Sequence, residues 1–91
     1  MAYSVSTTRG FDKELKKCIK RGFDRLKLNE VIRLLANHGS LPPKYKAHRL
    51  SGDYAGCWEC HISGDWLLVW EQNNDEFTIL FLHTGTHSDL F

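Results

Sequence analysis

In the first half of the chain, apolar residues recur at helical spacing in two stretches. The first repeat, at i, i+4, i+7 and i+8, comprises Phe11, Leu15, Cys18 and Ile19. The second repeat, within residues 24–37, comprises Leu28, Val31, Ile32 and Leu35. Each set gathers into one stripe of a helix. Thr7 or Thr8 can cap the first helix, and Gly22 and the Pro42-Pro43 pair are natural stops. The pattern predicts two adjacent helices that form an αα-hairpin.

In the second half, the pattern changes to that of β-strands. Three runs rich in strand formers cover about residues 57–62, 66–72 and 77–84. The connections at residues 63–65 and 73–75 are so short that they predict antiparallel hairpins. Residues 2–6 alternate and predict a first strand, whereas residues 86–91 fit a strand segment or one helical turn. We expect one α+β domain over residues 1–91, in the order β-α-α-β-β-β, with the helix pair packed on a mainly antiparallel sheet.

The charged residues are divided unevenly between the two halves. Residues 1–50 hold all twelve Lys and Arg with four acids, a formal charge of +8, whereas residues 51–91 hold seven acids and no Lys or Arg, a charge of −7. This division predicts a basic face for nucleic acid or an acidic protein segment, although lysines that only solvate helix faces give the same composition. No apolar run approaches the ~18 residues of a membrane span. The first twelve residues lack a signal-peptide pattern, so we expect a cytoplasmic protein.

The run from Cys57 to His61 matches C-x-x-C-H, the attachment pattern of c-type haem, and its two cysteines also suggest a redox or zinc site. Haem attachment requires export, and the chain shows no signal-peptide pattern. Residues three apart on a strand point to opposite faces, so the two sulfurs could not easily reach one haem edge. A redox pair normally opens a helix, and zinc needs further ligands. Buried free cysteines that act as small hydrophobes are therefore the expectation for Cys57 and Cys60.

Two histidines have neighbours that suit chemistry on RNA. His61 precedes Asp65 by four residues across a tight turn, so the carboxylate can fix the imidazole tautomer and stabilise its protonated form. His48 follows a basic and aromatic run at residues 44–46, which suits a phosphate backbone and a stacked base. An Asx-type turn and an exposed loop are the ordinary interpretations of these two segments.

The remaining histidines lie at the ends of predicted elements. His87 and Phe91 share one face if the tail forms a helical turn. His38 ends the second helix, where we expect it to act as a C-terminal cap. His83 lies at the end of the last long strand, and its position fits either a buried residue or a site residue.

Residues 43–50, 60–70 and 84–91 together carry the pattern Y-K-x-H-x-L, H-x-x-x-D-W-x-L-x-W and T-G-T-H-x-x-L-F. In order and spacing, this pattern resembles the YafQ-like toxins of the RelE/ParE superfamily along nearly the whole chain. The resemblance implies a RelE-like fold and the toxin of a type II toxin–antitoxin pair. Such toxins are endoribonucleases that enter the ribosomal A site and cut messenger RNA without a metal or other cofactor. The implied partners are the ribosome with its mRNA and an antitoxin, a small DNA-binding protein whose segment wraps the toxin and which can carry it to operator DNA.

The resemblance also implies which residues form the site. The expected catalytic residues are His48, His61, Asp65 and His87. The expected RNA-binding residues are Lys44, Lys46, Arg49, Trp66 and Phe91. We expect His48 to be the general base and His87 the general acid. His61, held by Asp65, is expected to stabilise the developing charge or share proton transfer.

The chain departs from this family at two positions where relatives often carry arginine. Trp58 or Glu59 occupies the position in the strand before the second histidine, and His83 occupies the position shortly before the T-G-x-H segment. Two alternatives to the ribonuclease therefore stay open. One is a non-enzymatic, ParE-like toxin that binds a protein such as a topoisomerase. The other is an attenuated toxin that mainly binds its antitoxin.

Overall fold

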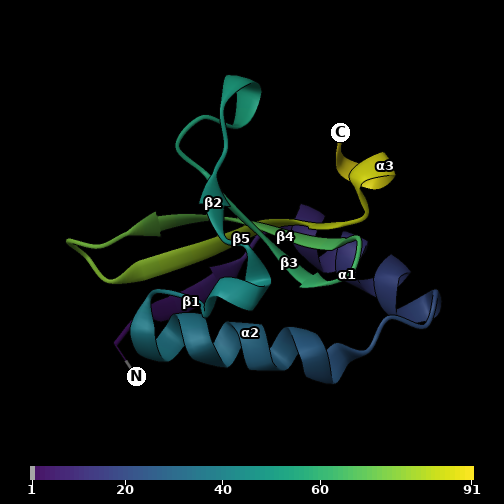
Figure 1. Cartoon of the computed structure of the whole chain (residues 1–91), viewed down its shortest axis with the longest axis horizontal. Helices are drawn as coiled ribbons and strands as arrows, with labels where there is room; N and C mark the ends of the chain where they lie inside the picture. The colour runs from purple at the N-terminus through teal and green to yellow at the C-terminus, as the bar shows by residue number, and fades with distance from the viewer. Residues whose placement is uncertain (1) are drawn as a thin grey trace.

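The structure is a computed structural model that describes residues 2–91. Over these residues the elements follow in the order β1 (Ser4–Thr7), α1 (Arg9–Lys20), α2 (Arg25–His38), η1 (Pro43–Tyr45), β2 (His48–Arg49), η2 (Gly52–Tyr54), β3 (Trp58–Ser63), β4 (Trp66–Asn73), β5 (Thr78–Gly85) and α3 (His87–Leu90), where η marks a short 3-10 helix. The strands form one sheet in the order β1-β5-β4-β3-β2 (Figure 1). β1 runs parallel to β5, and the other neighbours are antiparallel. The predicted α+β fold is confirmed.

Both long helices begin at side-chain caps: Thr8, one of the two caps expected for the first helix, and Asp24, for which no capping role was predicted. The Thr8 side chain accepts a hydrogen bond from the amide of Phe11 (3.0 Å), and Asp24 accepts one from the amide of Leu26 (2.9 Å). Each bond satisfies one of the amides that the first turn of a helix leaves unpaired. α2 ends at His38, as predicted, and Gly39 follows in the left-handed conformation with φ of 66°.

The core lies between the helix pair and one face of the sheet. Its buried side chains come from both helices, η1 and the three longest strands: Phe11, Cys18, Leu28, Val31, Leu35, Tyr45, Cys60, Ile62, Trp66, Leu68, Trp70, Ile79 and Phe81. Side chains alternate between the faces of a strand, so Glu59 and His61 of β3 point away from this core. The face opposite the helices therefore carries the polar groups of β3.

Two details of the strand prediction were wrong. β2 was expected to be loop, but it pairs with the start of β3, with His48 opposite Glu59. Phe77 was expected to begin the last strand, but it lies in the β4–β5 turn with φ of 54° and is 51% exposed. The Asn73 side chain stabilises this turn by accepting hydrogen bonds from the backbone amides of Asp75 and Glu76. β5 therefore begins after Phe77.

Within residues 2–91, no helix has both the length and the apolar composition that a membrane crossing requires.

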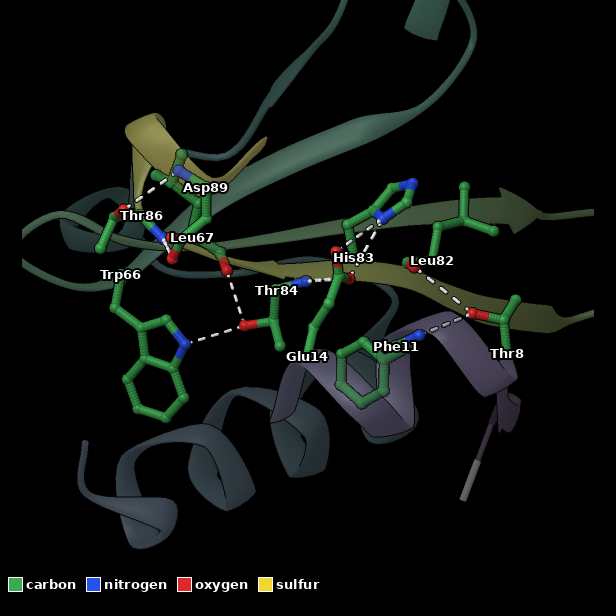
Figure 2. A network of polar contacts seen from close by, with 10 residues as sticks. All are labelled: Thr8, Phe11, Glu14, Trp66, Leu67, Leu82, His83, Thr84, Thr86 and Asp89. Carbon is green, nitrogen blue, oxygen red and sulfur yellow. Dashed lines mark hydrogen bonds and ion pairs between the residues drawn. The ribbon is translucent and has the colours of Figure 1, made fainter. Parts of the chain in front are cut away.

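A buried hydroxyl joins β4 to the end of β5. Thr84 is 1% exposed; its Oγ1 accepts the indole N–H of Trp66 (2.8 Å) and donates to the carbonyl of Leu67 (2.8 Å) (Figure 2). Glu14 of α1 accepts a hydrogen bond from the backbone amide of the same threonine (3.3 Å). The last residues of β5 are thus held from both the core and α1.

Replacing this hydroxyl by a methyl group tests its contribution to stability. We expect Thr84→Val to lower the free energy of unfolding by about 1–3 kcal/mol, because the buried indole N–H loses its acceptor. Urea denaturation followed by circular dichroism measures the change, with an unaltered m-value. Thr78→Val, at an exposed position of the same strand, is the control and should stay within about 0.5 kcal/mol of the parent. Equal losses in the two variants would contradict this role for the Thr84 hydroxyl.

Candidate active site

The register of the sheet brings distant histidines to one end of its open face. Leu67 of β4 pairs with His61 of β3 on one side and with Gly85 of β5 on the other. Asp65 lies two residues before Leu67, and His87 lies two residues after Gly85. Because β4 and β5 are antiparallel, these two residues meet beyond the end of the paired strands.

His87 and Asp65 form the closest pair of the site. Nδ1 of His87 donates to Oδ1 of Asp65, and the backbone amide of His87 donates to the same oxygen (3.3 Å). These contacts, the side-chain hydrogen bond foremost, lower the pKa of the Asp65 carboxyl. Both side chains are more than half exposed, so Nε2 of His87 is left to exchange a proton with a ligand.

His61 lies beside this pair but has a different partner. Its ring centroid is 5.9 Å from that of His87, and its Nδ1 is 3.0 Å from the carbonyl oxygen of Gly64. A carbonyl can only accept, so this contact selects the tautomer with the proton on Nδ1 and leaves Nε2 free. The expectation that Asp65 holds His61 was wrong. In the tight turn, the Gly64 carbonyl faces His61 while the Asp65 side chain faces α3.

His48 is placed on the same face by the β2–β3 pairing. Nδ1 lies 2.9 Å from the Lys46 carbonyl oxygen, and Nε2 lies 3.3 Å from Oε1 of Glu59. Both nitrogens therefore face hydrogen-bond acceptors, which hold the ring in place. Glu59 is 4% exposed and was not expected as a site residue. The signal that could have identified it is strand alternation, which puts Glu59 on the same face as His61.

The helical turn that carries His87 is fixed at its start. Thr86 and Asp89 form a reciprocal capping box (Figure 2). Arg21, the C-cap residue of α1, is paired with Asp89 (2.9 Å). These contacts order α3, which is too short to be stable alone. The tail is therefore a helical turn, one of its two predicted forms.

An aromatic cluster borders the site. Phe91 is 59% exposed, and its ring lies 6.3 Å from that of His87 and 5.5 Å from that of Tyr54 (centroid distances). Tyr54 in turn contacts His83 edge-on at 5.7 Å. Nδ1 of His83 lies 3.1 Å from Glu14, so this histidine joins α1 to β5 (Figure 2). Sequence reasoning did not identify Tyr54.

Two of the predicted RNA-binding residues do not face the site. Trp66 is 3% exposed and packs on Phe23 (5.1 Å between centroids), because it begins β4 on the face that also carries the core residues Leu68 and Trp70. Its ring cannot stack on a base. Arg49 lies over the ring of Trp58 at 5.3 Å, on the face opposite to that of its neighbour His48. Both assignments are corrected.

The other two predicted basic residues lie near His61. Nζ of Lys44 is 5.0 Å from the ring centroid of Tyr45, and Lys46 adopts a left-handed conformation with φ of 53° that ends η1. Both lysines line a groove that also includes His61. The loop before β2 thus supplies positive charge beside the histidines.

The two cysteines of the C-x-x-C-H run are small buried side chains in the structure. Cys57 and Cys60 are free and buried. Burial raises the pKa of both thiols, that of Cys60 to about 12, whereas a reactive cysteine needs a lowered pKa. Among residues 2–91, no cluster of three or more His, Cys, Asp or Glu has a geometry suited to a metal ion.

With this geometry described, the chain can be compared with known proteins. Residues 3–91 match the family described as the bacterial toxin of type II toxin–antitoxin systems, YafQ. The chain belongs to the YafQ toxin family. It is 35% identical over 82 residues to the mRNA interferase toxin YafQ of Escherichia coli K12. The aligned region covers 89% of this chain and 87% of that protein.

Solved structures of family members have the same fold. Crystalline YafQ from E. coli BL21(DE3) is 31% identical, with a TM-score of 0.90 over 98% of each chain. YafQ in the E. coli DinJ–YafQ toxin–antitoxin complex is 32% identical, with a TM-score of 0.88 over 100% of this chain and 99% of that one. The predicted membership of this toxin family is confirmed.

The Asp65–His87 contact can be tested by titrating the carboxyl group. A lowered folded-state pKa means that the pair stabilises the fold above the ordinary carboxyl pKa of about 3.9, and that this stabilisation is lost as the pH falls through the lowered value. In His87→Ala the pKa of Asp65 should rise towards the ordinary value, because the imidazole hydrogen bond is gone. Carbon-detected NMR titration measures it, with His83→Ala as the control. An unchanged Asp65 pKa in His87→Ala would contradict the assignment.

Proposed function

We propose that this protein is the endoribonuclease toxin of a type II toxin–antitoxin system and that it cleaves mRNA on the ribosome, in the cytoplasm. The observation that carries the proposal is the His87–Asp65 pair with His61 beside it. The ring centroids of His61 and His87 are 5.9 Å apart. Each of these imidazoles has an acceptor at Nδ1 and presents Nε2 to a ligand. Two such groups can transfer protons to and from one phosphodiester.

The reaction that fits these groups is attack by the ribose 2′-OH on the adjacent phosphorus. A base removes the proton of the 2′-OH, the new O2′–P bond forms, and the P–O5′ bond breaks. An acid then donates a proton to the departing 5′ oxygen, so that the products carry a 2′,3′-cyclic phosphate and a 5′-OH. Imidazoles, with ordinary pKa values near about 6.5, serve both roles near neutral pH.

The contacts of the three histidines support different roles. A carboxylate favours the protonated form of its partner, so the Asp65 contact supports His87 as the general acid. His61 keeps a free Nε2, which supports it as the base. Nε2 of His48 faces Glu59, so we assign His48 to stabilise the charge that develops on the phosphate, instead of the base role expected from sequence.

RNA contacts beyond the reacting phosphate involve the exposed residues around the histidines. We assign Lys44 and Lys46, which line the groove beside His61, to neutralise phosphates, and the exposed ring of Phe91 to stack on a base. Trp66 and Arg49 have no part in this proposal, because they face the core side of the sheet.

We also propose that the toxin binds a cognate antitoxin. The support is the structure of YafQ, a family member, in complex with DinJ. The excess of positive charge in residues 1–50 suits an acidic segment that orders as it binds. Contact with operator DNA would follow from the DNA-binding part of that partner.

Induced expression in bacteria tests the activity. The wild-type protein should arrest growth and leave codon-positioned cuts in cellular mRNA. His87→Ala should relieve the arrest, because loss of general acid catalysis slows cleavage by about 10²–10⁴-fold. His38→Ala, at the exposed end of α2, is the control and should stay toxic. If His87→Ala arrested growth equally and no cuts were found, a ParE-like action on a protein target would replace this proposal. Intact RNA together with tight antitoxin binding would indicate an attenuated toxin.

The acid can be identified with an RNA whose leaving 5′ oxygen is replaced by sulfur. A thiolate leaves without a proton, so His87→Ala should cleave this RNA at nearly the wild-type rate in programmed ribosomes. His61→Ala should stay slow on both substrates, because removal of the 2′-OH proton is unaffected by the sulfur. If sulfur instead restored the activity of His61→Ala and not of His87→Ala, the two roles would be reversed.

A further inference from the structure

A groove runs along the free edge of β3, next to His61. β2 pairs only with Trp58 and Glu59, so the later part of β3 has no strand beside it on that edge within the described residues. α2 and η1 flank this edge, and the space between them has a volume of about 530 Å³. The floor of the groove is formed by residues 61–64, and its walls are formed by α2 and by residues 44–46.

The charge of the groove is positive. Lys27 of α2, Lys44 and Lys46 line it. Nζ of Lys27 lies 3.2 Å from Oγ of Ser63, so this lysine reaches across the floor near the end of β3. Glu30 is the one carboxylate among the lining residues; Arg33 pairs with it (2.6 Å) and lowers its pKa. Three lysines therefore line the groove, and its one carboxylate is paired with Arg33.

The groove is continuous with the catalytic residues. His61 is part of its lining, and the His61 ring lies beside that of His87. A polymer that places one phosphate between the two imidazoles can therefore continue into the groove without crossing a side chain of the core. A histidine among the lining residues, with its ring beside that of His87, suits a nucleic acid that is cut next to the groove. A protein segment has no need of it.

We propose that this groove binds the sugar–phosphate backbone of the substrate RNA immediately beside the cleaved phosphate, with Lys27, Lys44 and Lys46 contacting successive phosphates. This inference rests on the proposed ribonuclease function and adds Lys27, on α2, to the residues that hold the RNA. The ammonium groups are point charges on flexible stems, so they grip the backbone without reading its sequence.

The test measures binding and not cleavage. The probe is a short single-stranded RNA with 2′-deoxyribose at every position that could be cut, and its affinity for the purified full chain is followed by fluorescence anisotropy as the salt concentration is varied. Lys27→Ala should weaken binding by about threefold or more at low salt and should reduce the slope of log affinity against log salt by about 0.7, the value for one phosphate contact on a single strand. Lys13→Ala, at an exposed position of α1, is the control and should match the parent.

Each other outcome overturns the inference. Equal affinities for Lys27→Ala and Lys13→Ala, or no binding of the RNA by the parent protein, would remove the groove from the RNA path. If Lys27→Glu weakened binding of the purified antitoxin and not of the RNA, the groove would belong to the antitoxin.

The ribonuclease proposal is judged separately, because cleavage that persists with an unaltered RNA affinity in Lys27→Ala overturns the groove alone. RNA binding without any cleavage overturns the catalytic assignment alone.

Discussion

The site depends on one residue position in the central strand of its sheet. Leu67 of β4 pairs with His61 on one side and with Gly85 on the other. A shift of either pairing by one residue would turn the affected side chains to the opposite face. His61 would then enter the core, or His87 would leave Asp65. The apolar core side of β4, with Trp66, Leu68 and Trp70 buried, makes such a shift costly and so fixes the positions of the proposed catalytic groups.

Local contacts then give chemically similar side chains different roles. Each imidazole has an acceptor at Nδ1: a carboxylate for His87, the Gly64 carbonyl for His61 and the Lys46 carbonyl for His48. The arginines that relatives often carry are absent, and the structure uses their positions differently. His83 pairs with Glu14, and buried Glu59 pairs with His48. Positive charge beside His61 comes from Lys27, Lys44 and Lys46.

Periodicity was enough to predict both long helices and the three main strands, and the place of Cys57 and Cys60 on a predicted strand was enough to expect buried free cysteines. These features depend on local sequence. The partner of Asp65 could not be predicted in this way, because it is set by the pairing of β4 with β5, whose register sequence alone does not give. Trp66 and Arg49 were misassigned for a simpler reason. Arg49 neighbours His48 on β2, so the two face opposite ways, and Trp66 begins β4 on the face that carries the core residues Leu68 and Trp70.

The chemistry of the new RNA ends tests the central claim most directly. If His61 and His87 flank one phosphodiester and activate its 2′-OH, every upstream fragment that the toxin produces on programmed ribosomes must end in a 2′,3′-cyclic phosphate. Mass spectrometry of those fragments decides the matter. The account predicts the cyclic phosphate together with a 5′-OH on the downstream fragment. Ends with a 3′-OH and a 5′-phosphate would mean that water attacks the phosphate, and they would contradict it.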